Sequence, residues 1–150
     1  MPRTIEERIA DVRKRLHDEV NVWVASANES GEAYLIPLSF YWDGTRLTVA
    51  TPKASRTARN LMRAGYARVA LARTSDAVIL EGPVVARYRD DIDAGLADAL
   101  AARAGFDART QVEEYVYLQL APQKVLAWRG PSEFTGRVVM RAGRWLANEG

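Results

Sequence analysis

Residues 21–51 contain three apolar runs that follow one another with short connections. The first is NVWVASA, and a turn centred on Gly31 separates it from the long aromatic and branched run AYLIPLSFYW. Asp43-Gly44 is a tight hairpin signal, and TRLTVAT follows it as the returning strand. These connections predict a three-stranded antiparallel meander and argue against a parallel βαβ fold.

Three further segments have the pattern of helices. A capping box of Thr4 and Glu7 opens the first one. Ser55 stands at the start of the second, which Gly65 ends, and Gly105 is the expected C-cap of the third. The helices are expected at about residues 5–19, 55–64 and 90–105.

The remaining apolar runs read as strands. Two of them are joined through TSD, and a final small hairpin turns at Ala142-Gly143. No repeat, linker or low-complexity tract interrupts the chain. The sequence therefore predicts one domain, residues 1–150, of the mainly β (α+β) class, with an antiparallel barrel-like sheet and flanking helices. These strands are expected at residues 66–73, 77–88, 114–120, 124–130 and 137–146.

Charge and composition narrow the classes of function. The formal net charge is only +2, and acidic residues interleave with the arginines along most of the chain, which argues against nucleic-acid binding. The apolar runs are too short to cross a bilayer, and the charged N-terminus lacks the apolar core of a signal peptide. A cytoplasmic protein without a membrane or nucleic-acid partner is expected.

The side chains offer little chemistry of their own. The chain has no cysteine, and its one histidine, His17, lies off the apolar stripe of the first helix, so no metal site is expected. Glycine-rich phosphate loops and a G-x-S-x-G elbow are missing from the sequence. The acidic pairs at 6–7, 90–91 and 113–114 are interpreted as helix starts rather than catalytic dyads. An enzyme of this kind needs a bound organic cofactor.

The segment TPKASRTARN, residues 51–60, concentrates anion-binding groups at a predicted helix start. Ser55 stands where an N-cap belongs, with free backbone amides just beyond it. Arg56 and Arg59 share one helix face, and Lys53 precedes them in the loop. These groups predict a phosphate site, and the alternative is a solvated arginine face capped by serine. The candidate site comprises Thr51, Lys53, Ser55, Arg56, Arg59 and Asn60.

The order of these motifs carries a resemblance. IPLSFYWDGTRLTVATPKASRTARNL is followed by ILEG at 79–82, by PQKVLAW at 122–128 and by the C-terminal strands. This ordered set, over about residues 5–146, resembles the pyridoxamine 5'-phosphate oxidase-like family of flavin-binding split barrels. The resemblance implies a six-stranded antiparallel split β-barrel and a homodimer that holds its cofactor in a groove between the subunits.

The resemblance also implies roles for particular residues. Thr51, Lys53, Ser55 and Arg56 match the segment that grips the cofactor phosphate, and Arg59 and Asn60 match it less closely. A second match falls on the strand that runs along the isoalloxazine ring, where a proline marks an edge or bulge beside a ligand. That strand contributes Pro37, Leu38 and Ser39. Trp128 matches a wall supplied by the other subunit, with ordinary core packing as the alternative.

The sequence departs from the pattern of the authentic oxidase, and these differences decide which branch of the family is expected. The chain has SRT at 55–57 where the authentic oxidase has S-R-K, and it lacks the C-terminal R-x-H segment. These differences favour a sibling branch that uses deazaflavin coenzyme F-420, or FMN, to pass hydride to or from a small organic substrate. Ser39 and Tyr41 are the candidates for proton delivery. The alternatives are a non-catalytic flavin, deazaflavin or haem carrier, and a barrel that has lost its ligand.

Overall fold

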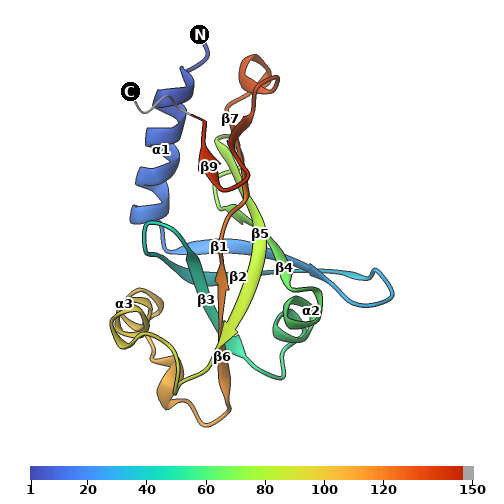
Figure 1. The fold of residues 1–150 in the computed structure, drawn as a ribbon, viewed down its shortest axis with the longest axis vertical. Helices are drawn as coiled ribbons and strands as arrows, with labels where there is room; N and C mark the ends of the chain where they lie inside the picture. The colour runs from blue at the N-terminus through green and yellow to red at the C-terminus, as the bar shows by residue number, and fades with distance from the viewer. Residues whose placement is uncertain (147–150) are drawn as a thin grey trace.

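The structure is a computed structural model that describes residues 1–146, and its centre is a closed antiparallel barrel (Figure 1). The barrel strands follow the order β4-β1-β2-β3-β6-β5, and pairing of β4 with β5 closes the ring. Strands β7, β8 and β9 extend the sheet from β5. This arrangement confirms the predicted six-stranded barrel and adds three strands to it. The strands are β1 Asn21–Ala27, β2 Ala33–Trp42, β3 Leu47–Pro52, β4 Tyr66–Leu71, β5 Ala77–Arg87, β6 Tyr115–Leu120, β7 Lys124–Trp128, β8 Val138–Arg141 and β9 Arg144–Trp145.

Three α-helices flank the barrel within residues 1–146. Helix α1 lies beside β7 and β9 at one end of the molecule, and α2 and α3 flank the other end (Figure 1). Both hydrogen bonds of the capping box between Thr4 and Glu7 are present, and Gly65 and Gly105 adopt the left-handed conformation at the ends of α2 and α3. The bounds are α1 Ile5–Asp18, α2 Arg56–Ala64 and α3 Ala94–Ala104, with 3-10 turns η1 Ala108–Thr110 and η2 Pro131–Glu133.

Only one of the three acidic pairs that were predicted to start helices lies in the first turn of a helix. Glu6 and Glu7 lie in the first turn of α1, as expected. The pair at 90–91 lies in a turn ahead of α3, whose N-cap is Asp93. The pair at 113–114 precedes strand β6 and no helix. The prediction failed there because acidic residues mark a helix start only when a helical pattern follows, and the segment after 114 is a short run of aromatic and branched residues that forms a buried strand.

Strand β2 changes partner along its length. Its residues 33–39 pair with β1, and its residues 40–42 pair with β3. Strands β2 and β3 therefore separate at Ser39, which creates the split of the barrel. Pro37 pairs with Trp23 of β1 in the part of β2 that has no β3 partner, so the missing proline N–H breaks no ladder on that edge.

Strand β5 also bridges two partners, and a glycine makes this possible. Residues 77–81 pair with β7, and residues 84–87 pair with β6. At the changeover a Cβ on Gly82 would lie 2.2 Å from the carbonyl oxygen of Ala121. Only glycine allows this close approach of two backbones, which explains why the ILEG motif ends in glycine.

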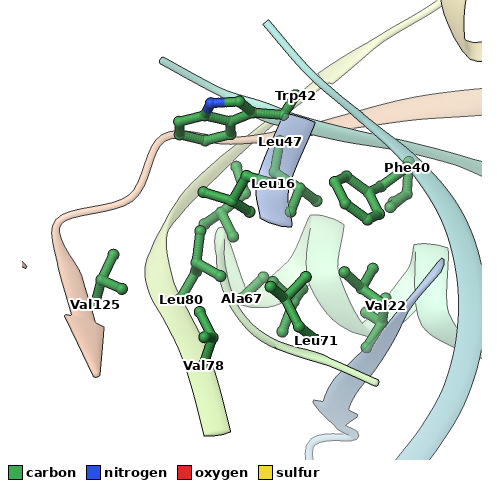
Figure 2. Packing of buried hydrophobic residues seen from close by; sticks show 14 of the residues in the cluster. Leu16, Val22, Phe40, Trp42, Leu47, Ala67, Leu71, Val78, Leu80 and Val125 are labelled. Carbon is green, nitrogen blue, oxygen red and sulfur yellow. The ribbon is translucent and has the colours of Figure 1, made fainter. Parts of the chain in front are cut away.

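The hydrophobic core fills the barrel interior. Alternate residues of β1, β4 and β5 point inward, and α1 contributes the apolar stripe that the sequence predicts. Figure 2 shows Leu16 of α1 packed among inward side chains of several strands, including Phe40, Leu47 and Leu80. A second, smaller cluster joins α3 to the outer side of the barrel through Ala97, Leu100 and Tyr117.

Candidate functional site

The N-terminus of α2 is built by hydroxyl side chains at the end of β3. Ser55 is the N-cap, and its Oγ accepts a hydrogen bond of 3.1 Å from the backbone N–H of Ala58. Thr51 is buried, with its Oγ1 3.2 Å from that same oxygen. The two hydroxyls thus fix the first turn of α2 and leave its leading amides directed out of the helix.

Three arginines of α2 line one open pocket. Arg56, Arg59 and Arg63 face the β1–β2 hairpin across a volume of about 430 Å³, and Tyr34 of β2 also lines this pocket. The guanidinium carbon of Arg56 is 5.6 Å from the ring centroid of Tyr34, and an Nη2 of Arg63 donates to the carbonyl of Ala27. Among residues 1–146, none of these arginines forms an ion pair.

The pocket also carries acidic groups. Glu29 and Glu32 of the hairpin lie on its wall opposite the helix, outside ion-pair distance of the arginines. Three guanidinium groups against two carboxylates leave the pocket with an excess of positive charge. Arg56 stands in the first turn of α2 and Arg63 in its last turn. The donors at the Arg56 end, next to the helix N-terminus, fit the phosphate of a cofactor.

Lys53 contacts different neighbours from Arg56. Its Nζ is 3.9 Å from a carboxylate oxygen of Glu114 and 5.3 Å from the ring centroid of Tyr88. These residues belong to a separate cleft of about 390 Å³ beside β6. The structure therefore does not bring Lys53 and Arg56 together on one wall, although both flank the N-terminus of α2.

Asn60 has a structural contact of its own. The side chain is mostly buried, and its Nδ2 donates to Ser26 Oγ at 3.1 Å. This bond ties α2 to β1 and fixes how the arginine face is presented.

Pro37, Leu38 and Ser39 lie together on a shallow groove. The groove has a volume of about 460 Å³ and also includes Trp23 and Phe106. Ser39 Oγ donates to Asn21 Oδ1 at 3.2 Å, so its hydroxyl is already engaged. The predicted ring-contacting strand is accessible because β3 leaves β2 at this point.

Trp128 lies far from α2 within one chain. It pairs with Ala77 at the start of β5, whereas Tyr66, which follows α2, pairs with Pro83. Six residues of extended strand correspond to roughly 20 Å. The Trp128 ring packs edge-to-face on Phe134 at 5.8 Å and remains partly exposed. Any contact of Trp128 with a ligand held at α2 therefore needs a second copy of the chain.

The other candidate side chains are placed as follows. Tyr41 packs against the small cluster under α3, with the guanidinium carbon of Arg103 at 5.7 Å from its ring centroid. His17 is exposed at the end of α1. Within residues 1–146 no three histidine, aspartate or glutamate side chains gather closely enough to hold a metal ion. None of the helices described is both long and apolar enough to span a membrane.

Two residues near the candidate site were not predicted from the sequence. Arg63 follows Arg56 by seven residues, a helical spacing that places both on one face and that was available in the sequence. Tyr117 is buried under α3 and has a hydroxyl with no hydrogen-bond partner in the described chain. No sequence signal separates it from an ordinary core aromatic residue.

A closed six-stranded barrel that splits beside a cationic helix N-terminus defines the class of the split β-barrels. The family model described as pyridoxamine 5'-phosphate oxidase matches residues 9–129. The chain therefore belongs to the pyridoxamine 5'-phosphate oxidase family, a family associated with flavin binding.

Solved structures agree on the fold. An F-420 reductase has 13% identity and a TM-score of 0.63, with 75% of this chain and 94% of that chain covered. The haem storage protein HutZ from Vibrio cholerae has 14% identity and a TM-score of 0.67, with coverage of 80% and 94%. PhzG from Burkholderia lata, solved with tetrahydrophenazine-1-carboxylic acid, has 19% identity and a TM-score of 0.56, with coverage of 85% and 78%. At such low sequence identity, the structural similarity shows a shared fold and no shared function. No curated protein matches the sequence.

Proposed function

We propose that the chain is an oxidoreductase that binds deazaflavin coenzyme F-420, or FMN, and transfers hydride to or from a small organic substrate. The single observation that carries the proposal is a set of α2 arginines, starting with Arg56 at the helix N-terminus, that form no ion pair with any described residue, in a chain of this family. When bound, the cofactor supplies the redox chemistry. The chain's own residues hold the phosphate, position the ring and exclude water.

The proposed phosphate site uses Arg56 and Arg59, with the N-terminal amides of α2. Both side chains are exposed, and Ser55 and Thr51 hold the helix start in place. Lys53 contributes long-range charge from its position beside Glu114 and Tyr88. Between the two cofactors F-420 is favoured, because an acidic tail suits the third arginine, Arg63, on the same wall.

We also propose that two copies of the chain share the site. The outward-facing row Pro37, Trp23, Ala70, Ile79 and Leu126 runs in register across five strands, and the inward neighbours of these residues form the core. Trp23 is 41% exposed, which is unusual for such a large side chain.

A row of charged residues beside this apolar row could pair with the same row of a second copy of the chain. Arg68, Glu81 and Lys124 follow one another across the next register position and alternate in sign. An inverted copy can therefore oppose unlike charges around an apolar centre, as a two-fold interface requires. Trp128 belongs to the same side of the sheet, so this contact would also bring it to the partner's groove.

Titration of the purified chain with FMN and with F-420, followed by fluorescence, tests the proposal. Arg56→Ala together with Lys53→Ala is expected to weaken cofactor binding at least tenfold and to reduce its salt dependence. Arg56→Ala alone is expected to account for most of this loss, because Arg56 lines the arginine pocket and Lys53 does not.

Arg13→Ala is the matched control, since Arg13 is an exposed helical arginine on α1. Unchanged binding in the double variant would contradict the phosphate site. Tight binding without turnover on a broad panel of electron acceptors would favour the carrier function instead of the enzyme.

A further inference from the structure

The arginine pocket beside α2 has two walls of opposite charge. Arg56, Arg59 and Arg63 form one wall, and Glu29 and Glu32 lie on the other, at the tip of the β1–β2 hairpin. All five side chains are exposed, and none of them forms an ion pair with any described residue. No other charged side chain within residues 1–146 lines the pocket. The unlike charges therefore face one another across the pocket without neutralising one another.

The acidic wall stands on an ordered turn. The side-chain oxygen of Asn28 accepts hydrogen bonds from the backbone N–H groups of Ser30 and Glu32, at 3.0 and 2.9 Å. Gly31 adopts a φ of 79°, and its N–H donates to the carbonyl of Asn28 at 2.9 Å. These bonds fix the backbone that carries both glutamates, so the position of their carboxylates is set by the turn.

Two side chains of α2 fix the base of the hairpin against the helix. The Nδ2 of Asn60 donates to Ser26 Oγ at 3.1 Å, and an Nη2 of Arg63 donates to the carbonyl of Ala27 at 2.8 Å. The hairpin projects on the same side of the barrel as α2 (Figure 1). Because both elements are held, the separation between the acidic and the basic wall is built into the fold.

The two walls act differently on a ligand. A phosphate on the basic wall is attracted by the guanidinium groups and repelled by the carboxylates across the pocket. A cationic group on the acidic wall is attracted by those carboxylates. A ligand with a phosphate at one end and an ammonium group at the other therefore meets favourable charge at both ends. A phosphate with an apolar tail leaves the carboxylates unsatisfied.

We propose that the arginine pocket selects amphoteric phosphate esters, with the phosphate on Arg56 and Arg59 and an ammonium group on Glu29 and Glu32. The two glutamates are then specificity-determining residues, because they distinguish a phosphate ester that carries an ammonium group from one of the same shape without it. This assignment rests on the proposed phosphate site, since the same arginines hold the anion. It depends neither on the identity of the redox cofactor nor on a second copy of the chain.

The test compares 2-aminoethyl phosphate with propyl phosphate, which differ only in that an ammonium group replaces a methyl group. Both are titrated into the full chain at about pH 8, where each phosphate is a dianion, and binding is followed by NMR of the backbone amides. The parent is expected to bind the aminoethyl ester about threefold more tightly, a modest ratio because the charges are exposed to water.

Neutralising the acidic wall is expected to reverse this preference. In Glu29→Gln combined with Glu32→Gln, affinity for the aminoethyl ester is expected to fall about fivefold, because the arginines then repel the ammonium group unopposed. Affinity for propyl phosphate is expected to rise about twofold, because the repulsion of its phosphate is removed. Its binding is also expected to depend more steeply on salt, since the pocket has gained net positive charge.

Glu6→Gln combined with Glu113→Gln is the matched control, because it makes the same change in net charge on two exposed residues outside the pocket. This control is expected to keep the preference of the parent for the aminoethyl ester. Equal affinity of the parent for the two esters would overturn the proposal. A rise in affinity for both esters in the hairpin variant would also overturn it, because the glutamates would then merely neutralise the arginines.

Arg56→Ala combined with Arg59→Ala separates this proposal from the phosphate site on which it rests. The double variant is expected to weaken binding of both esters at least tenfold. If it does so while the hairpin variant leaves both affinities unchanged, the phosphate site stands and the selection by Glu29 and Glu32 is refuted. If neither ester binds the parent, or if binding does not require the arginines, both proposals fail together.

Discussion

Two arginine clusters of this protein have opposite environments. One joins α1 to the far end of the chain: Arg3 donates to both carboxylate oxygens of Glu133, and Arg15 donates to the backbone carbonyl of Asp76. These groups are nearly fully buried. The other cluster, on α2, is exposed and has no ion pairs among residues 1–146. Residue type is the same in both, so their roles must follow from their partners.

The buried cluster, which we call the clamp, comprises Arg3, Arg8, Arg15, Asp76 and Glu133. Arg8 donates to the carbonyl of Gly136 and lies 3.8 Å from Glu133. The clamp thereby holds the N-terminal helix against η2 and the β4–β5 loop. Both of its carboxylates form ion pairs with its arginines, which makes it structural. The α2 cluster keeps its donors available, which makes it suited to an anionic ligand.

The largest expected change in the free energy of unfolding comes from a substitution in the clamp. Glu133→Gln removes the carboxylate that Arg3 and Arg8 share. Arg3 keeps Asp11 and Asp76 as partners, whereas the buried guanidinium of Arg8 loses its carboxylate. The free energy of unfolding is expected to fall by about 3 kcal/mol, measured by urea denaturation. Glu113→Gln, on an exposed glutamate, is the control and is expected to be neutral. A loss below about 1 kcal/mol would remove the distinction between the clusters.

The same carboxylate gives a pH dependence of intermediate size. Hydrogen bonds from Arg3 hold the pKa of Glu133 well below its usual range. The folded chain therefore binds this proton more weakly than the unfolded chain, so the stabilisation is present above about pH 4.3 and is lost as the pH falls below it. The group's contribution to the slope is expected to reach at most about 1.4 kcal/mol per pH unit.

Urea midpoints measured from about pH 6 to about pH 3 check this slope. Glu133→Gln cannot release or bind that proton, so its stability is expected to fall less steeply with acid than that of the parent. Parallel curves for the two proteins would show that other carboxylates dominate the acid response, and would weaken the assignment of the clamp as the stabilising cluster.

The smallest expected change in the free energy of unfolding comes from substitutions in the α2 cluster. Arg56→Ala combined with Arg59→Ala is expected to change the free energy of unfolding by no more than about 0.5 kcal/mol, because neither side chain has an ion-pair partner to lose within the described residues. Cofactor binding is nevertheless expected to weaken. A stability loss above 1 kcal/mol would mean that the arginine face packs structurally, and the contrast with the clamp would fail.

Much of the fold follows from local signals. The meander of residues 21–51, the hairpin at Asp43-Gly44 and the caps of Thr4, Ser55 and Gly105 all appear as predicted. Each depends on residues within a few positions of one another, which is why pattern and turn chemistry suffice. The acidic pair at 113–114 was misplaced because the same residues serve helix starts and loops.

The candidate site was predictable only in part. The segment 51–60 does form a capped helix start, and Arg56 and Arg59 do share a pocket. Lys53 turned out to contact Glu114 and Tyr88, which lie far along the chain, and no local rule gives that direction. Tyr34 lines the same pocket because β1 pairs with β2 and so brings this residue beside α2.

The sequence alone determined the order and the approximate bounds of the helices and strands. It also showed that the chain lacks a reactive side-chain set typical of a cofactor-free enzyme. Tertiary structure decided which arginines are neutralised and which remain available. Arg3 and Glu133 are 130 residues apart in the chain, and only the closed barrel brings them within 2.7 Å. Pairing of charges is a property of distance in space, and a one-dimensional pattern does not contain it.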